Sequence, residues 1–314
     1  GTACRIFTGA AIPPRCDAVV MQEDVVRDGA RAAFSRRPRG AENIRRAGED
    51  IAQGALALAR GERLGPNQIG LLATLEHDRV TVARRPVVAI VSTGDELREA
   101  GDPPREGSVV DCNGPALAAW VRACGGEPRR LPFARDDRAA VRDALVSALA
   151  CADLVLSIGG VSVGDHDVVK PALEDAGIAL NFWKVAIRPG KPLVYGRSGA
   201  KRFLGLPGNP ASALLTFVLF GAPLLRAMQG DRAPVPPVYR ARLARDVTHS
   251  TGRLEFVRAT LRWGDDGLSA EPLARQSSGS VASMAWADGL IQLAADVATF
   301  PAGSVVPVVR FADV

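Results

Sequence analysis

ADLVLSIGGVSVGDHDVVK (residues 152–170) joins an apolar run to a turn rich in glycine and acidic residues. The apolar run predicts a buried strand, and Gly159 and Gly160 mark its end. Glycines let backbone N–H groups approach an anion closely, and Asp167 is of a type that holds metal ions. A turn followed by a capped helix would explain the same residues without a ligand. The neighbouring segments decide between these interpretations.

Strand-like and helix-like segments alternate on both sides of this stretch. VVAIVS (87–92) and RFLGL (202–206) have the composition of buried strands, whereas residues 114–126 and 136–151 have helical periodicity. Such alternation predicts a mostly parallel sheet with helices on both faces. The predicted fold class is therefore α/β, with a central three-layer α/β/α domain over residues 86–230.

The segment NPASALLTFVLFGAPLLRAM (209–228) closes this domain. We expect one long helix with Asn209 as its N-cap and Pro210 in its first turn. Its most apolar part, residues 213–225, is too short to span a bilayer and contains Pro223. These features predict a buried helix and no membrane association.

Smaller regions flank the central domain. Residues 1–53 contain short β-like runs, of which CRIFTG (4–9) is the first, and predict a β-rich lobe. Residues 54–85 predict a short helical segment that begins at Pro66. Beyond a proline-rich linker, residues 231–314 form short β-runs between glycine turns and predict a small β-barrel. The chain does not begin with methionine, so we expect the lobe and the helical segment to be incomplete on their N-terminal side.

Composition narrows the classes of function. The formal net charge is only +5, and aromatic residues make up 5% of the chain, which argues against a nucleic-acid-binding protein. The five cysteines are an odd number without a Cys-x-x-Cys pair, which indicates a reducing compartment and no disulfide framework. The sequence shows no secretion signal, and a cytoplasmic location is expected. Cys112 and Cys124 are interpreted as core residues.

Four polar or glycine-rich turns follow predicted strands. They are STGDEL (92–97), ARDD (134–137), the glycine turn after Ile158 and GLPGNPAS (205–212). One such turn is more often structural than functional, but the carboxyl ends of parallel strands share one edge of a sheet. Glu96, Asp136 and Asp167 would then gather, and clustered carboxylates indicate a divalent cation, with Mg²⁺ the best match.

A basic turn, IRPGKPLV (187–194), supplies Arg188 and Lys191, which suit an oxyanion or phosphate; a surface turn is the alternative. The glycine turn has neither the Walker pattern nor the G-x-G-x-x-G dinucleotide pattern. The three histidines lack metal-ligand spacing, so a histidine-bound zinc is not expected.

The ordered set of motifs resembles the molybdopterin molybdenumtransferases, the family of MoeA and the gephyrin E-domain. STGDEL, GGVSVGDHDVVK, RPGKP and GLPGNPAS follow IFTGAAIP (6–13) and NIRRAGEDI (43–51), and the resemblance covers essentially the whole chain. It implies insertion of molybdenum from molybdate into adenylylated molybdopterin, with Mg²⁺-assisted release of AMP. It also implies a homodimer, a MogA-like central domain, and contacts with a molybdopterin adenylyltransferase and molybdoenzyme-maturation proteins.

The resemblance also implies site residues. The acids expected at the reacting centre are Asp50, Glu96, Asp136 and Asp167, of which the last three would hold the metal. Thr8 and Arg45 would come from the lobe and reach the partner subunit. The remaining substrate-binding residues would be Thr93, Gly94, Asp95, Gly159, Gly160, Ser162, Arg188, Lys191, Pro207, Asn209, Ser212, Arg258 and Ser280.

Two departures from the family pattern stand out. Arg188 occupies a position where the family usually has lysine, so a point charge becomes a planar fork. An N-terminal segment with an aspartate-bearing MDGYA-type motif is missing from the sequence.

Two alternatives remain at this stage. A molybdopterin adenylyltransferase shares the α/β fold but is a single domain with a GGTG-type loop, unlike GGVSVG. A non-catalytic dimeric scaffold would have no reason to keep clustered carboxylates.

Overall fold

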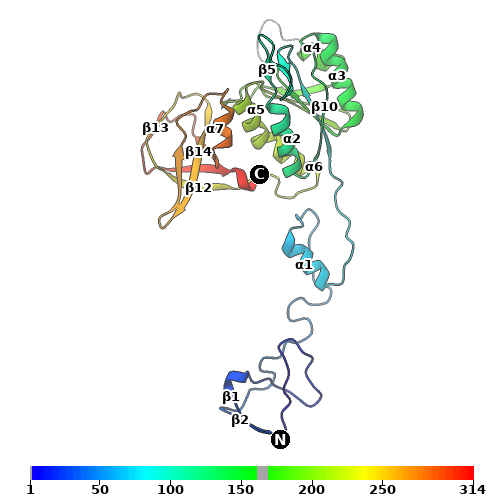
Figure 1. Ribbon diagram of the computed structural model, residues 1–314, viewed down its shortest axis with the longest axis vertical. Helices are drawn as coiled ribbons and strands as arrows, with labels where there is room; N and C mark the ends of the chain where they lie inside the picture. Colours follow the sequence, from blue (N-terminus) through cyan, green and yellow to red (C-terminus); the bar gives the residue numbers. More distant parts are fainter. Residues whose placement is uncertain (1, 161–168) are drawn as a thin grey trace. The chain divides into compact units, whose positions relative to one another are not determined.

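The computed structural model describes residues 2–160 and 169–314. The predicted site residues Ser162 and Asp167 lie outside the described residues. The chain forms two units, an N-terminal unit (Gly1–Ala59 and Pro66–Leu75) and a C-terminal unit (Arg60–Gly65 and Glu76–Val314). Figure 1 labels the main elements.

The N-terminal unit contains less regular structure than predicted. A hairpin pairs β1 (Val25–Asp28) with β2 (Arg31–Phe34) after the short helix η1 (Gln22–Asp24). The run CRIFTG is not a strand, and Phe7 is 79% exposed. The expectation of a strand there was wrong, because a β-run becomes a strand only when a neighbouring strand satisfies its backbone groups. The helix α1 (Pro66–Thr74) begins at Pro66 as predicted.

A six-stranded sheet forms the centre of the C-terminal unit. Its order is β6-β3-β7-β11-β10-β8, and the first four strands are parallel to one another, so the prediction of a mostly parallel sheet is confirmed. Only β10 runs antiparallel to its neighbours. The strands are β3 (Val87–Ser92), β6 (Glu127–Arg130), β7 (Leu154–Ile158), β8 (Ala179–Trp183), β10 (Val194–Ser198) and β11 (Lys201–Leu206).

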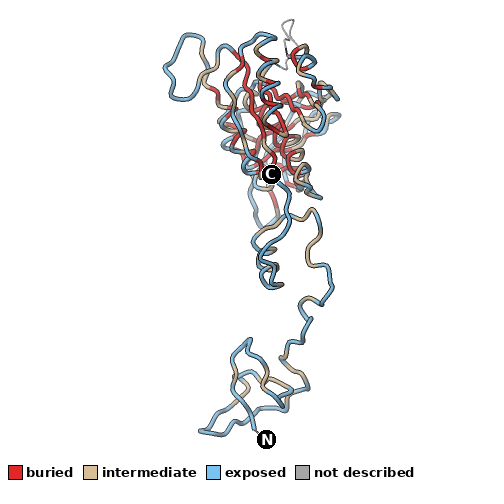
Figure 2. The backbone as a smooth tube through the Cα atoms, turned by 90° about the vertical axis from the view of Figure 1, so that its right-hand side faces the viewer, coloured by how far each residue is buried: buried red, intermediate tan, exposed pale blue. Residues whose placement is uncertain are grey.

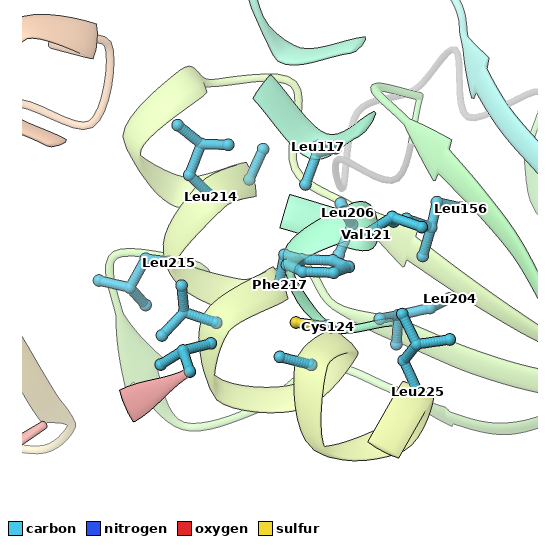
Figure 3. Close-up of a cluster of buried hydrophobic side chains, with 14 of the residues drawn as sticks. Leu117, Val121, Cys124, Leu156, Leu204, Leu206, Leu214, Leu215, Phe217 and Leu225 are labelled. Carbon is cyan, nitrogen blue, oxygen red and sulfur yellow. The ribbon is translucent and has the colours of Figure 1, made fainter. Parts of the chain in front are cut away.

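Helices cover both faces of this sheet. Alternate strand residues enter different apolar clusters: Val88 and Ile90 belong to one, Ala89 and Val91 to the other. The first cluster includes Leu117, Phe217 and Leu225 from the helices on that side (Figure 3). Figure 2 shows the buried residues concentrated in this unit. The helices are α2 (Asn113–Ala123), α5 (Pro210–Thr216) and α6 (Ala222–Met228) on the first side, with α3 (Arg138–Cys151) and α4 (Val169–Asp175) on the second. The three-layer prediction is confirmed.

The helix from Pro210 to Met228 is not regular throughout. Between α5 and α6, the segment η2 (Phe217–Gly221) is π-helical. Pro223 has no N–H to donate to the carbonyl of Leu219 and would collide with it in a regular helix, and the wider π turn relieves this conflict. Residues 213–225 alone are too short to span a bilayer. The whole helix is longer, and within the described residues it is the one helix long and apolar enough to cross a membrane. Its 67% burial inside the unit identifies it as a core helix.

The C-terminal part closes into a barrel, as predicted. The strands follow the order β15-β12-β18-β16-β14, and β14 also pairs with β15 to close the ring. The ring consists of β12 (Val238–Leu243), β14 (Leu254–Gly264), β15 (Gly267–Pro272), β16 (Gly289–Leu293) and β18 (Val305–Arg310). Apolar side chains such as Ala259, Ile291 and Val308 fill its interior.

The barrel and the α/β domain share contacts. Met284 of α7 (Val281–Ala285) and Leu290 pack into the same apolar cluster as Phe217. The backbone N–H of Ala211 donates to the carbonyl of Ser278 at 2.9 Å. In addition, β9 (Ile187–Arg188) pairs in parallel with β14. The short pairs β4 (Leu97–Arg98) with β5 (Val109–Val110) and β13 (Val247–Thr248) with β17 (Thr299–Phe300), and the terminal helix η3 (Phe311–Asp313), complete the fold. The barrel therefore contacts segments next to the predicted site.

Candidate functional site

The four predicted turns meet at one edge of the central sheet. The N–H of Thr93 donates to Ile158 O at 3.0 Å, and the N–H of Gly94 donates to Ala134 O at 3.1 Å. The N–H of Gly159 donates to Leu206 O at 3.1 Å. These bonds join the ends of β3, β6, β7 and β11 side by side, and the predicted convergence is confirmed.

The STGDEL turn carries Glu96 and contacts Asp136 of the ARDD turn. Gly94 has φ +150°, and a Cβ built there would lie 2.5 Å from Oε2 of Glu96, so only glycine leaves room for this carboxylate. The N–H of Asp95 points to Oδ2 of Asp136 at 3.4 Å. Glu96 and Asp136 are both exposed, and in the described residues no lysine or arginine forms an ion pair with either carboxylate.

These carboxylates fit a magnesium ion by the chemistry of their oxygen donors. The described residues contain no group of three potential ligands close enough to hold a metal. The third predicted ligand, Asp167, lies outside the described residues, so the complete ligand set stays a prediction.

Arg105 supports the acidic turn and was missed by the sequence analysis. Its Nη2 donates to the carbonyls of Asp95 at 2.7 Å and Leu97 at 3.0 Å. This arginine lies in an irregular segment without a motif, so only its position in space reveals the contact. It holds the backbone that carries Glu96.

Asp111 and Asn113, at the start of α2, were also missed. Asp111 is 4% exposed and accepts from the N–H of Gly114 at 2.9 Å and the hydroxyl of Ser92 at 3.2 Å. Asn113 donates from Nδ2 to Gly208 O at 2.8 Å, while its Oδ1 is buried without a hydrogen-bond partner among the described residues. An Asp-x-Asn sequence directly before a helix was the available signal.

The glycine turn and the GLPGNPAS turn touch. A Cβ on Gly208 would lie 3.5 Å from the Cα of Gly159. Pro207 and Ser212 are buried, and Gly160 and Asn209 are exposed. Asn209 does occupy the N-cap position, but its side chain makes no capping hydrogen bond, which corrects the prediction of a side-chain cap. Its amide is left at the surface beside the two turns.

The basic turn lies where the α/β domain meets the barrel. Arg188 and Lys191 are exposed, and the carbonyl of Lys191 accepts from the N–H of Val185 at 3.1 Å. Nη1 of Arg188 lies 3.7 Å from Oε2 of Glu255 in the barrel domain. Two cationic side chains are therefore available to an anion.

The two site residues predicted in the barrel have structural contacts. Arg258 is fully buried and donates to Ser283 Oγ at 3.2 Å and Ser277 O at 3.1 Å. Burial lowers the pKa of its guanidinium. The hydroxyl of Ser280 caps α7 by accepting from the N–H of Ser283 at 3.3 Å. In this conformation Arg258 has no exposed surface for a ligand.

The remaining predicted residues belong to the N-terminal unit. Thr8, Arg45 and Asp50 are exposed there, and their site roles stay predictions.

All five cysteines are free; Cys124 is buried, as predicted for a core residue, whereas Cys112 is only partly buried. Burial raises the pKa of the Cys112 and Cys124 thiols, which keeps them protonated and disfavours a nucleophilic role.

Three family models match successive parts of the chain. The MoeA N-terminal region (domains I and II) matches residues 1–75, the probable molybdopterin binding domain matches residues 89–227, and the MoeA C-terminal region (domain IV) matches residues 240–311. Molybdopterin molybdenumtransferase from Nostoc sp. is 38% identical over 302 residues, which cover 93% of this chain and 68% of the relative. The chain belongs to the molybdopterin molybdenumtransferase family.

Further similarities to known proteins support the same family assignment. The Haemophilus influenzae molybdopterin molybdenumtransferase is 40% identical over 82% of this chain, and the match spans 64% of that relative's length. The solved structure of the molybdopterin biosynthesis MoeA protein from Pyrococcus horikoshii superposes with a TM-score of 0.82 at 27% identity, and covers 98% of this chain and 74% of that one. This family comprises transferases of molybdenum cofactor biosynthesis. A single-domain adenylyltransferase is not favoured, because the matches include the lobe and the barrel.

Proposed function

We propose that this chain inserts molybdenum from molybdate into adenylylated molybdopterin and releases AMP. The observation that supports the proposal most strongly is the meeting of the acidic STGDEL turn and the GLPGNPAS turn at one sheet edge. This edge offers the carboxylates of Glu96 and Asp136, which form no ion pair with a lysine or arginine in the described part of the chain, beside glycine backbone in a member of the molybdenumtransferase family. Both substrates are anions, which requires cationic holders close to a metal site.

The roles follow from the chemistry of each group. Arg188 and Lys191 would hold molybdate or phosphate oxygens, and backbone N–H groups near Gly159 and Gly160 would add neutral donors. Glu96 and Asp136, with Asp167, would hold Mg²⁺, which supplies charge neutralisation at the phosphoanhydride. Asp50, Thr8 and Arg45 would contribute from the N-terminal unit. Thr93, Gly94, Asp95, Ser162, Pro207, Asn209 and Ser212 would shape the substrate contact, and Arg258 and Ser280 would support it from the barrel.

The assembly is part of the same proposal. A homodimer in the cytoplasm is expected, with a molybdopterin adenylyltransferase as the source of the adenylylated substrate. The resemblance to MoeA supports this expectation.

The decisive experiment measures molybdate-dependent AMP release from adenylylated molybdopterin with Mg²⁺. It uses this chain, alone and extended by the N-terminal segment that the resemblance predicts. Release by either form supports the transferase, and release by neither favours a scaffold. Asp136→Asn should lower the rate by about a hundredfold or more, because a metal-ligating charge is lost. Asp143→Asn, an exposed acid on α3, is the matched control and should leave the rate unchanged.

A further inference from the structure

The barrel domain places a buried carboxylate directly beside the basic turn. In the parallel pairing of β9 with β14, Glu255 is the register partner of Arg188. The N–H of Leu254 donates to Ala186 O at 3.1 Å, which fixes this register. The side chain of Glu255 is 14% exposed, whereas that of Arg188 is 46% exposed. The carboxylate is thus the fixed member of the pair, and the guanidinium is the member that faces solvent.

The buried His249 ring packs beside this carboxylate. Its Nδ1 lies 3.2 Å from Oε2 of Glu255 without forming a hydrogen bond, and its Nε2 is 2.6 Å from the carbonyl of Val297. The ring also lies against Phe300, with 5.9 Å between the ring centroids. The side chain of His249 is only 3% exposed, so it has little freedom to move. The packing around His249 therefore limits the space in which the Glu255 side chain can move.

The same carboxylate oxygen still has bonding capacity. Oε2 of Glu255 is buried and has no hydrogen-bond partner among the described residues, although Nη1 of Arg188 is 3.7 Å away. A buried acceptor without a donor is costly, which favours approach of the guanidinium. Because a guanidinium has five N–H groups in a planar fork, it can contact the carboxylate on one side and an oxyanion on the other. A lysine ammonium is not planar and does not present two separate hydrogen-bonding edges in this way.

We propose that Glu255, confined beside the buried His249 ring, is a positioning residue that orients the Arg188 guanidinium toward an oxyanion substrate. This inference deepens the proposed function and rests on it, because Arg188 is assigned there to anion binding. The oxyanion is either molybdate or the pyrophosphate-like part of the adenylylated substrate. The barrel domain thereby contributes to anion binding without contacting the anion.

The test separates binding from turnover. Calorimetry measures the affinity of the chain for molybdate and for inorganic pyrophosphate, and the AMP-release assay gives kcat and KM for both substrates. Glu255→Gln should lower the affinity for one of the two anions by about tenfold. It should raise the KM of the corresponding substrate by a similar factor, while kcat changes little. Glu255→Asp should recover part of the affinity. Glu271→Gln is the matched control, since Glu271 pairs with Arg245 at 3.1 Å on the same domain but away from the basic turn.

A double-mutant cycle tests whether Glu255 acts through Arg188. In an Arg188→Ala background, Glu255→Gln should cause no further loss of affinity. Equal losses in both backgrounds, or unchanged affinity for both anions in Glu255→Gln, would overturn the inference. If Glu255→Gln lacks a cooperative thermal transition, the cycle is run with Glu255→Asp, and the same outcomes decide. Anion binding that depends on Glu255, without AMP release, would retain this inference and count against the proposed function.

Discussion

At the scale of single residues, Gly94 determines where the Glu96 carboxylate can lie. An alanine Cβ would be 2.5 Å and 2.7 Å from the two carboxylate oxygens, and φ +150° disfavours any side chain. Because Glu96 is flexible, it would swing away without unfolding the domain. Gly94→Ala should therefore lower AMP release by about tenfold to a hundredfold with a small change in melting temperature.

Gly101 provides the control for this substitution. It also has positive φ, +98°, but a Cβ added at this position would meet nothing within 4 Å. Gly101→Ala should reproduce the backbone strain without moving Glu96. If both variants lose the same activity, strain alone explains the loss and the steric argument is wrong.

Glu42 provides a test of electrostatics in the N-terminal unit. Hydrogen bonds from Arg36, and then from the N–H of Arg39, lower the pKa of Glu42 from its ordinary 4.5 to about 2. A folded-state pKa below the unfolded value means that the stabilisation is present above pH 4.5. It is lost as the pH falls from 4.5 towards 2.

Carbon-13 NMR titration of the Glu42 side-chain carboxyl should give a midpoint near 2. In Arg36→Ala the midpoint should move upward, since the largest cause of the shift has been removed. A wild-type midpoint at the ordinary value would show that the pair does not persist in solution.

At the scale of elements, helix α3 depends on a side-chain cap and α5 does not. Asp137 accepts from the N–H of Ala140 at 2.8 Å, whereas Asn209 makes no capping bond at the start of α5. Asp137→Ala should lower the free energy of unfolding by about 1 kcal/mol in urea titrations. Asn209→Ala should lower the free energy of unfolding clearly less. Equal losses would mean that the two caps differ less than their hydrogen bonds indicate.

At the scale of the whole molecule, the two units differ in their apolar cores. No described residue of the N-terminal unit is buried, whereas the C-terminal unit has three buried apolar clusters. Regions without buried apolar contacts open readily. Limited trypsin digestion of the chain should therefore cut among the arginines of residues 1–59 first and leave a resistant fragment that begins after residue 75. Simultaneous loss of both units would contradict this order.

The local hydrophobic pattern of the sequence predicted much of the fold. The apolar runs of β3, β7 and β11 and the periodicity of α2 and α3 predicted the layers, since burial on two faces leaves a readable period. The glycine and acidic turns predicted the site edge because parallel strands end together. The strand expected at residues 4–9 was wrong, because it depends on backbone pairing that the local pattern does not reveal. The predicted long helix is present, but the sterics of Pro223 add a π-helical turn to it.

The sequence by itself determined the α/β core, the barrel, the acidic and basic turns and the family. Only the tertiary structure brought Asn113 to the carbonyl of Gly208 and Glu255 to Arg188. The two residues of each pair are distant along the chain, and no sequence motif predicts that they are in contact. Their proximity depends on which helices and strands pack together, a choice made by the burial of apolar surface over the whole unit rather than by neighbouring residues.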